Sequence, residues 1–295
     1  MTLHSFKEIS TYMIEKDMNL VGAILEIDAL NLDCTSKEIY DSLSNRLIDM
    51  RNSVKKNPET IGKTKIVQND AAKIKKYRLD RKPLSGDLIS RASEIALSVA
   101  TVNASMGRIV AAPTAGSCGI LPGLLFAWEE QRKHKCCQEK IIVEGLIVAA
   151  GVGRIIANRA TLAGAEGGCQ VECGAAIAMG SAALVWMECQ NAEKCFQAAS
   201  ICLKSIMGLI CDPVAGLVEV PCIKRNGSLV SLAVLSADMA IAGIKSVIPF
   251  DEIVDAMYSV GKALPLTLKE TGEGGLAVTP TGLSIQDRLK KDYFR

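Results

Sequence analysis

"CGAAIAMGSAALVWME" (residues 173–188) decides the fold, because nearly every position in it is apolar or small. The tract lies between Glu172 and Glu188 and is too short to span a bilayer. A second apolar tract, "IIVEGLIVAAGVGRIIANRA" (141–160), is interrupted by Glu144 and Arg154. Both tracts are therefore predicted to be buried helices of a soluble protein.

Helical periodicity continues outward from these tracts. Residues 5–17 and 36–56 have the charged amphipathic pattern of helices, and Thr35 stands three residues before Glu38, as in a capping box. Further helices are predicted at 88–107, 119–133, 139–160, 173–189, 191–210, 228–245 and 250–270. Alternating polar and apolar strands are hard to find. The predicted fold class is mostly α, with many helices in a single catalytic domain.

The length of 295 residues fits one large domain or two modest ones. We expect residues 1–75 to form an N-terminal helical segment that packs on a helical core of residues 76–295. A polar stretch at 73–87, with Pro83 and Gly86, is the predicted connection between them. One continuous domain over 1–295 is the alternative.

Composition limits the possible functions. Hydrophobic residues make up 49% of the chain but aromatic residues only 4%, which favours closely packed helices. The net charge of +2 argues against nucleic acid as the main partner. The start, "MTLHSFKEIS", has no apolar leader, and eleven cysteines make an odd number. We therefore expect a cytoplasmic protein without a disulfide framework or a membrane span.

Glycine-rich segments lie between the predicted helices. Glycine permits close backbone approach, so that N–H groups can converge on an anion. Any one such loop is an ordinary turn by default, but four in one chain favour a lined pocket. The four are "APTAGSCGILPG" (112–123), "AGAEGGCQ" (163–170), "CDPVAGLVEVPC" (211–222) and "TGEGGLAVTPTG" (271–282).

Other familiar sites find little support. "GVGRII" at Gly151 resembles a dinucleotide fingerprint but has Ile156 where a third small residue belongs, and no strand precedes it. His4 and His134 lie in charged contexts, which leaves a histidine triad or zinc site without ligands. No lysine has the context of a Schiff-base residue, so pyridoxal phosphate is not expected.

The cysteines are either small buried hydrophobes or metal ligands. Cys34, Cys189, Cys195 and Cys202 lie in or near apolar helices and are predicted to pack, and the adjacent Cys136 and Cys137 fall in a charged surface loop.

Cys169, Cys211 and Cys222 differ, because each adjoins a glycine- or proline-bearing loop. Asp212 and Pro213 have the pattern of an N-cap and first helical residue, and a short helix about 10 Å long would let both flanking thiols reach one centre. Spacing alone leaves packing and a shared metal site both open.

Four long segments then follow one another in order: "NASMGRIVAAPTAGSCGILPG" (103–123), "EGGCQVE" (166–172), "MGLICDPVAGLVEVPCIKRN" (207–226) and "KETGEGGLAVTPTG" (269–282). They closely resemble the α chain of the iron–sulfur-dependent bacterial L-serine dehydratases. The resemblance covers nearly the whole chain and is sharpest from about residue 100 to 285.

In that family three cysteines bind a 4Fe-4S cluster, and by motif they correspond to Cys169, Cys211 and Cys222. The resemblance implies glycine-rich loops around a metal-cluster pocket, in which one iron lacks a protein ligand and acts as an open Lewis acid. L-Serine would lose its hydroxyl there and give pyruvate and ammonia. Cys118 and Cys173 lie near these motifs and are not assigned as ligands.

Further roles follow from the same resemblance. The base is unassigned, with Lys224 and Lys269 as candidates. Lys224 and Arg225 either attract the anionic substrate or balance cluster charge, and a solvated surface is an equal alternative. The candidate substrate-binding residues are Thr114, Ala115, Gly116 and Ser117, with Thr271, Gly274 and Gly275 as a second wall.

Family enzymes also carry a β part with a serine–histidine–threonine motif that this chain lacks. We therefore expect a separate β subunit and an oligomer. Two alternatives stay open: a related cluster-dependent lyase acting on L-cysteine or another hydroxy acid, and a non-catalytic helical binding subunit.

Overall fold

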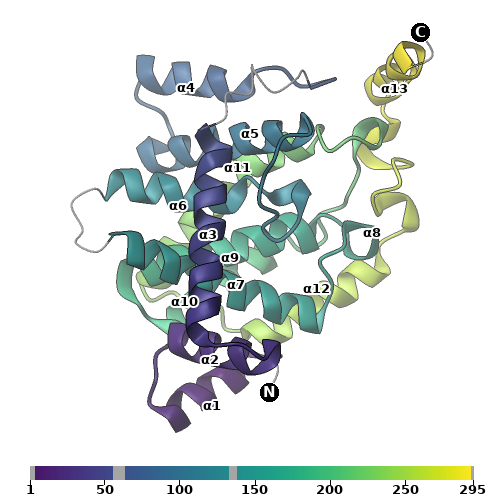
Figure 1. The fold of residues 1–295 in the computed structure, drawn as a ribbon. Coiled ribbons are helices and arrows are strands. Elements are labelled where there is room, and N and C mark those ends of the chain that lie inside the picture. Colours follow the sequence, from purple (N-terminus) through teal and green to yellow (C-terminus); the bar gives the residue numbers. More distant parts are fainter. Residues whose placement is uncertain (1–3, 56–63, 133–137, 294–295) are drawn as a thin grey trace.

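The computed structural model describes residues 4–55, 64–132 and 138–293. Its centre is helix α9 (Ala175–Cys189), in which every residue from Ala175 to Met187 is buried (Figure 1). The apolar tract at 173–188 thus lies in a buried core helix, as predicted. The long helices that pack most extensively on α9 are α6 (Ile120–Gln131), α7 (Gln138–Arg159), α10 (Ala192–Ser205) and α11 (Cys222–Ile241).

Two helical segments have the length and composition of a membrane span, Glu139–Arg159 and Gln170–Cys189. In the second, 94% of the most apolar window is buried inside the protein, and in the first 67% is. Other helices therefore cover the apolar surface that lipid would otherwise cover.

Helices α5 (Gly86–Ala104) and α6 pack with their backbones in contact. A Cβ atom on Gly123 would lie 2.7 Å from the carbonyl oxygen of Ala92, and one on Gly119 would lie 2.2 Å from that of Ala96. No real side chain tolerates such distances, so only glycine fits at these two positions. The small residues of the sequence therefore permit the close helix packing that composition indicates.

The N-terminal helices α1 (Phe6–Lys16), α2 (Leu20–Leu32) and α3 (Ser36–Lys55) pack onto this body. The ring of Phe6 stacks on Phe196 of α10 with 3.8 Å between centroids, and Phe196 meets Phe250 edge to face. Ile24 and Leu47 belong to the same buried cluster as the α9 residues. One hydrophobic core thus includes these helices, and a boundary near residue 75 stays a prediction.

The capping box predicted at the start of α3 is confirmed. The backbone N–H of Thr35 donates to the Glu38 carboxylate at 2.8 Å, and the N–H of Glu38 donates back to the Thr35 hydroxyl at 3.2 Å. Periodicity does not reveal α2, because apolar residues occupy most of its length and leave little polar contrast between its faces.

The predicted connection at 73–87 is wrong over its first part, which is helix α4 (Asp70–Asp80). Only Ala71 of this helix is buried, so it shows no apolar stripe, and its charged side chains form a solvent-facing surface. The helix lies on α5, where the Arg78 guanidinium donates to Glu94 at 3.0 Å.

The segment before α4 is tied to a distant loop. The buried carboxylate of Glu219 accepts hydrogen bonds from the backbone N–H groups of Lys65, Ile66 and Val67, at 2.7 to 3.0 Å. A carboxylate with three backbone donors needs no cation, so this contact fixes the entry to α4 without a salt bridge.

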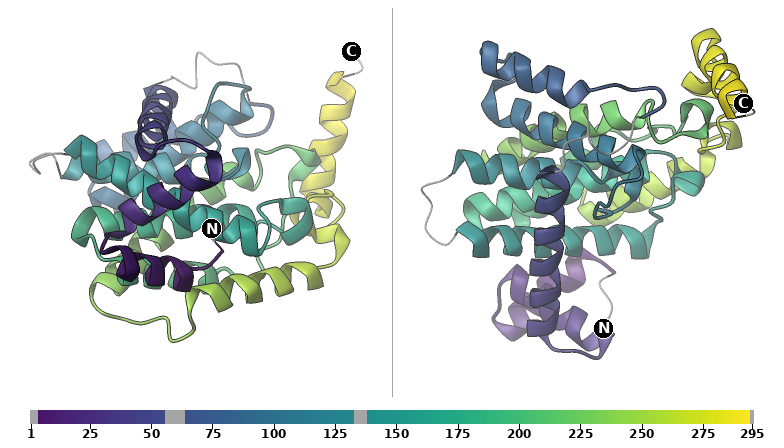
Figure 2. Two further views of the ribbon diagram at one scale, coloured as in Figure 1. Left: turned by 60° about the horizontal axis from the view of Figure 1, so that its bottom comes forward. Right: turned by 45° about the horizontal axis from the view of Figure 1, so that its top comes forward.

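Several helices begin or end at residues other than those predicted. Helix α10 stops at Ser205 and not at 210, and α12 (Phe250–Ala263) stops before Pro265, because the residue preceding a proline disfavours helical geometry. Helix α11 begins at Cys222, six residues before the predicted start. A further helix, α13 (Pro280–Tyr293), was not predicted and projects from the body in both views of Figure 2.

The mostly α fold class is confirmed. Within residues 4–55, 64–132 and 138–293 there is no β-strand, and only one isolated bridge joins two extended residues, Cys211 and Lys269.

We predict that Gly123→Ala destabilises the protein by about 1–3 kcal/mol, because the new methyl group must push α5 and α6 apart. Chemical denaturation measures this change in the free energy of unfolding. Gly22→Ala in α2 is the matched control, since a Cβ there meets nothing closer than 3.5 Å. The control should be neutral or stabilising by up to about 1 kcal/mol. Equal effects of the two substitutions would contradict the close contact.

Candidate functional site

The three thiols picked out by their loops come from three separate segments. Cys169 precedes the π-helical turn η3 (Gln170–Gly174), Cys211 lies in the bridge with Lys269, and Cys222 is the first residue of α11. Cys169 and Cys211 are buried, and Cys222 is half-buried.

These thiols are close enough to influence one another's charge. Burial raises the pKa of Cys211, and the charges of Cys169 and Cys222 raise it further. Burial and then the charge of Cys169 raise the pKa of Cys222 to about 12. The structure thus brings the three residues into one region, where ionised sulfurs repel each other.

Gly168 and Gln170 place Cys169 beside the loop that carries Cys211. Gly168 has a φ of 77°, and a Cβ atom there would lie 2.9 Å from the carbonyl oxygen of Leu209. The N–H of Gln170 donates to that same oxygen at 3.0 Å, and its fully buried side chain accepts from the N–H of Gly208 at 2.8 Å. A side chain at 168 or a shorter amide at 170 cannot make this junction.

Asp212 and Arg225 hold the same loop from the other side. Asp212 is buried, and its carboxylate accepts from the Arg225 guanidinium at 2.9 Å and from the N–H of Leu276 at 2.8 Å. Arg225 also donates to the carbonyl oxygen of Ile210 at 2.9 Å. This pair therefore joins the Cys211 loop, the first turn of α11 and the segment before α13.

The short helix predicted after Asp212 is wrong. The chain forms only the turn η4 (Val214–Gly216), in which Ala215 has a φ of 54°. Asp212 does not cap it, because both carboxylate oxygens bind partners distant in sequence. The thiols of Cys211 and Cys222 approach each other through this bent loop and not along a helix axis.

Asn226 joins the start of α11 to the loop before α6. Its side-chain oxygen accepts from the N–H of Gly119 at 2.9 Å, and its nitrogen donates to the carbonyl oxygens of Gly116 and Cys222 at 2.7 and 2.9 Å. The residue is fully buried. Both N–H donors of the Asn226 amide and one of the two lone pairs on its oxygen are thus used, and these hydrogen bonds link two of the glycine-rich segments.

Cys169 is the thiol whose ionised form is most favoured. Its pKa is lowered, first by a hydrogen bond from the Cys173 thiol and then by the charge of Arg225, against the effect of burial. Burial tends to lower the pKa of Arg225, but the negative charges of Cys169 and Asp212 raise it overall. The pKa of Cys173 is raised, first by its interaction with the Cys169 thiol and then by burial.

The first predicted substrate segment adjoins these groups. Thr114 and the turn η2 (Ala115–Ser117) precede the buried start of α6. The hydroxyls of Thr114 and Ser117 lie 3.1 Å apart, and Ser117 is fully buried. The two hydroxyls predicted to bind substrate are thus hydrogen-bonded to each other, and a role of this segment in binding a substrate carboxylate stays a prediction.

The second predicted wall lies beside the Cys211 loop. Gly275 has a φ of 57°, and a Cβ atom there would meet the Asp212 carboxylate at 2.5 Å. Gly274 is buried, whereas Thr271 is exposed and its hydroxyl donates to the carbonyl oxygen of Thr267 at 3.2 Å. The wall is therefore built around Asp212, and its contact with substrate stays a prediction.

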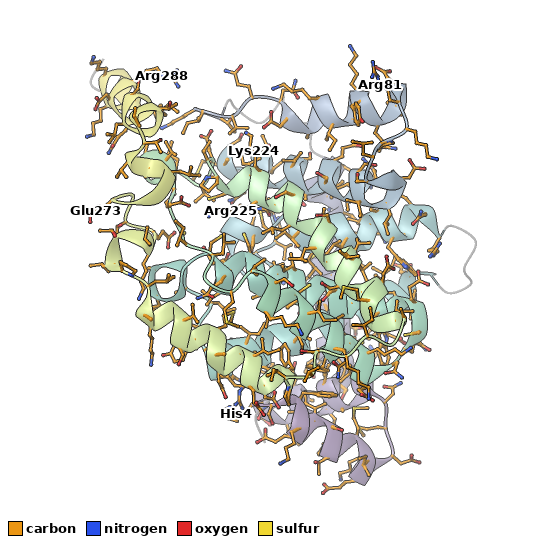
Figure 3. All side chains as sticks on the ribbon, turned by 180° about the vertical axis from the view of Figure 1, so that it is seen from behind. His4, Arg81, Lys224, Arg225, Glu273 and Arg288 are labelled. Atoms are coloured by element: carbon orange, nitrogen blue, oxygen red, sulfur yellow. The ribbon has the colours of Figure 1, made fainter. Side chains whose placement is uncertain are left out.

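The two lysine candidates have partners elsewhere. The ammonium of Lys224 pairs with Asp70 of α4 at 3.1 Å, with 62% of its side chain exposed, and that of Lys269 donates to the carbonyl oxygen of Lys262 at 3.4 Å. Figure 3 shows Lys224 and Arg225 together at the start of α11 and His4 at the opposite end of the molecule. His134, Cys136 and Cys137 lie outside the described residues.

Sequence reasoning overlooked Glu172, although it ends the motif at 166–172. Its carboxylate approaches the Cys211 sulfur at 3.9 Å and also bonds the Thr114 side chain. Burial raises the pKa of Glu172 and so does the charge of Glu270, while the two hydrogen bonds act in the opposite direction.

Three cysteine thiols are donors of the kind that iron–sulfur clusters take. Within the described ranges, no three His, Cys, Asp or Glu side chains are grouped so that they could hold one metal ion. A cluster binds each thiolate at a different iron, so its ligands need not converge on one point. The three thiols repel one another when ionised, and the Arg225 guanidinium lies beside them. This is the donor chemistry that such a cluster requires.

A separate hollow of about 600 Å³ lies between α1, α10 and α12. Its lining includes Phe6, Phe196, Val247 and Phe250 and none of the predicted site residues. The thiol region is therefore the better candidate, since it gathers the four motif segments.

Known proteins resemble this chain over nearly its whole length. A family model described as the serine dehydratase alpha chain matches residues 5–277. The chain is 42% identical over 284 residues to a probable L-serine dehydratase alpha chain of Bacillus subtilis, covering 96% of this chain and 94% of that relative. It is 40% identical over 295 residues to the L-serine dehydratase alpha chain of Peptoniphilus asaccharolyticus, covering 99% of each.

A longer relative matches differently. The L-serine dehydratase of Helicobacter pylori is 36% identical over 209 residues, which are 69% of this chain but only 46% of that protein. More than half of the longer relative thus has no counterpart in the alignment.

We predict that Asn226→Ala destabilises the protein by about 1–3 kcal/mol, because the buried N–H of Gly119 loses its acceptor. Denaturant unfolding measures the loss. Ser231→Ala, on the exposed side of the same helix, is the control and should change stability by no more than about 0.5 kcal/mol. An Asn226→Ala protein as stable as the control would show that these hydrogen bonds are dispensable.

Proposed function

The chain belongs to the serine dehydratase alpha chain family, and on that premise we propose that it deaminates L-serine to pyruvate and ammonia. The end-to-end similarity to two alpha chains carries the proposal, because it includes every glycine-rich segment of the candidate site. The three neighbouring thiols of the candidate site and the Arg225 guanidinium beside them support the proposal independently of that similarity.

We further propose that Cys169, Cys211 and Cys222 hold a 4Fe-4S cluster. When bound through three thiolates, such a cluster supplies one iron without a protein ligand, an open Lewis-acid position for the substrate hydroxyl. The protein's own part is to hold the three sulfurs in place. Gln170 does so for the Cys169 segment, and Asp212 with Arg225 does so for the Cys211 loop.

Arg225 and the glycine-rich loops complete the proposed site. The Arg225 guanidinium balances negative charge next to Cys169. Backbone N–H groups around Gly116 are the proposed donors to the substrate carboxylate, in a turn whose shape Asn226 fixes. Loss of the α-proton and the hydroxyl gives 2-aminoacrylate, which tautomerises and hydrolyses in water to the two products.

A separate β chain is the proposed partner. The two relatives of similar length are named as alpha chains, and the longer Helicobacter pylori relative has more than half its length outside the match. A second polypeptide that supplies this remainder would account for both facts. We propose that the two chains assemble into the active oligomer.

We predict that serine at position 169, 211 or 222, introduced singly, removes bound iron after anaerobic reconstitution, because an alcohol replaces a thiolate ligand. Iron and sulfide analysis measures the loss. Cys195→Ser is the control, since Cys195 is a fully buried thiol in α10 away from the loops, and it should retain the iron. A wild-type chain that binds no iron, or three variants that all keep it, would contradict the cluster.

We predict that L-serine is turned over in the presence of the β chain and that L-threonine and L-cysteine are turned over more slowly. Pyruvate or 2-oxobutyrate formation measures the three rates in parallel. Preference for L-cysteine would favour a desulfidase-like lyase, and inactivity towards all three amino acids by an iron-loaded complex would overturn the proposed reaction.

A further inference from the structure

We propose that Glu172 binds the α-ammonium group of the substrate and so makes the site select amino acids over the corresponding acids without an amino group. The inference rests on the proposed function, because it assumes that L-serine binds beside the three thiols. Neither the family match nor the relatives' names assign this residue a role.

Glu172 lies where the site segments meet. It belongs to the turn η3, between Cys169 and α9. A Cβ atom placed on Gly164 would lie 2.5 Å from one carboxylate oxygen of Glu172, and one placed on Gly116 would lie 3.5 Å from the other. The Cys211 sulfur is 3.9 Å away. This one carboxylate therefore lies beside three of the four glycine-rich segments.

Gly164 is required by its neighbours and not by its own backbone conformation. Its φ lies outside the left-handed region, so a residue with a side chain would fit there on backbone grounds. What excludes a side chain is the carboxylate of Glu172, together with that of Glu270, whose oxygen would be 3.3 Å from the same Cβ. The carboxylates of Glu172 and Glu270 thus both lie close to Gly164.

The carboxylate of Glu172 retains capacity for a further donor. An ionised carboxylate accepts up to about four hydrogen bonds. Glu172 has the Thr114 hydroxyl as a donor, and the Cys211 thiol, which is a weak donor, stops donating once it is ionised as a cluster ligand. Among the described residues no ion pair is recorded for Glu172 or Glu270. An ammonium group supplies three N–H donors and the missing positive charge.

The position of Glu172 also matches the shape of an α-amino acid. Thr114, its hydroxyl donor, directly precedes the turn proposed to receive the substrate carboxylate. The ammonium and carboxylate of an amino acid are attached to the same carbon, so their two binding sites must be neighbours. Glu172 and the turn at Ala115–Ser117 meet this requirement.

The experiment compares two unreactive probes that differ in the amino group. L-Alanine has both the ammonium and the carboxylate of L-serine but no hydroxyl, whereas propanoate keeps the carboxylate alone. Calorimetry under anaerobic conditions measures the affinity of each for the iron-loaded complex with its β chain. We expect Glu172→Gln to weaken L-alanine binding about ten-fold or more and to leave propanoate binding equal or stronger.

Glu166→Gln is the matched control, because Glu166 is an exposed carboxylate in the neighbouring helix α8 (Gly164–Gly167). It should leave both affinities unchanged. Glu172→Asp keeps the charge and should restore part of the preference for L-alanine. Should Glu172→Gln lose its iron, Glu172→Asp carries the comparison, and a selective weakening of L-alanine is again the expected result.

Two outcomes overturn the inference: equal weakening of both probes, which indicates a structural role alone, and a wild-type complex with no preference for L-alanine over propanoate. Failure of the proposed function is a separate observation, since an iron-loaded wild-type complex would then leave L-serine unchanged.

Discussion

The amide of Asn226 makes three hydrogen bonds that join the first turn of α11 to the loop before α6. Most of the site depends on this junction. Helix α11 carries Cys222 at its start and Arg225 one turn later, and the loop carries the turn at Ala115–Ser117. Because the amide is fully buried, neither segment can move without leaving polar groups unpaired. The orientation of a helix and the shape of a loop are thus set by one side chain.

A rigid interior makes this precision useful. Helix α9 is buried along almost its whole length, and α5 and α6 approach until their backbones touch. Such packing transmits small displacements, because no void is available to absorb them. The polar contacts of Gln170 and Asp212 then extend the rigid region to the loops. Flexible glycine sequences are in this way held by neighbours that are not flexible.

Sequence reasoning succeeded where one short segment determines the outcome. The tract at 173–187 consists of apolar or small residues throughout, and the Thr35–Glu38 capping box needs only four residues. It failed where a distant partner decides. Asp212 has the pattern of an N-cap, but Arg225 and Leu276 take both its oxygens. Glu172 is one more polar residue in a motif until the fold places Gly164 and Gly116 against it. Helix α4 was missed for another reason, because its charged surface lacks apolar periodicity.

The hydrogen bond from the N–H of Leu276 to Asp212 links positions 64 residues apart, near the end of a 295-residue chain. During synthesis the ribosome releases the Cys211 loop long before it releases this donor, and helices near the N-terminus can already have packed. The loop can reach its final shape only after residue 276 has emerged. A nascent chain arrested before that residue would therefore present its thiols in an unfinished pocket.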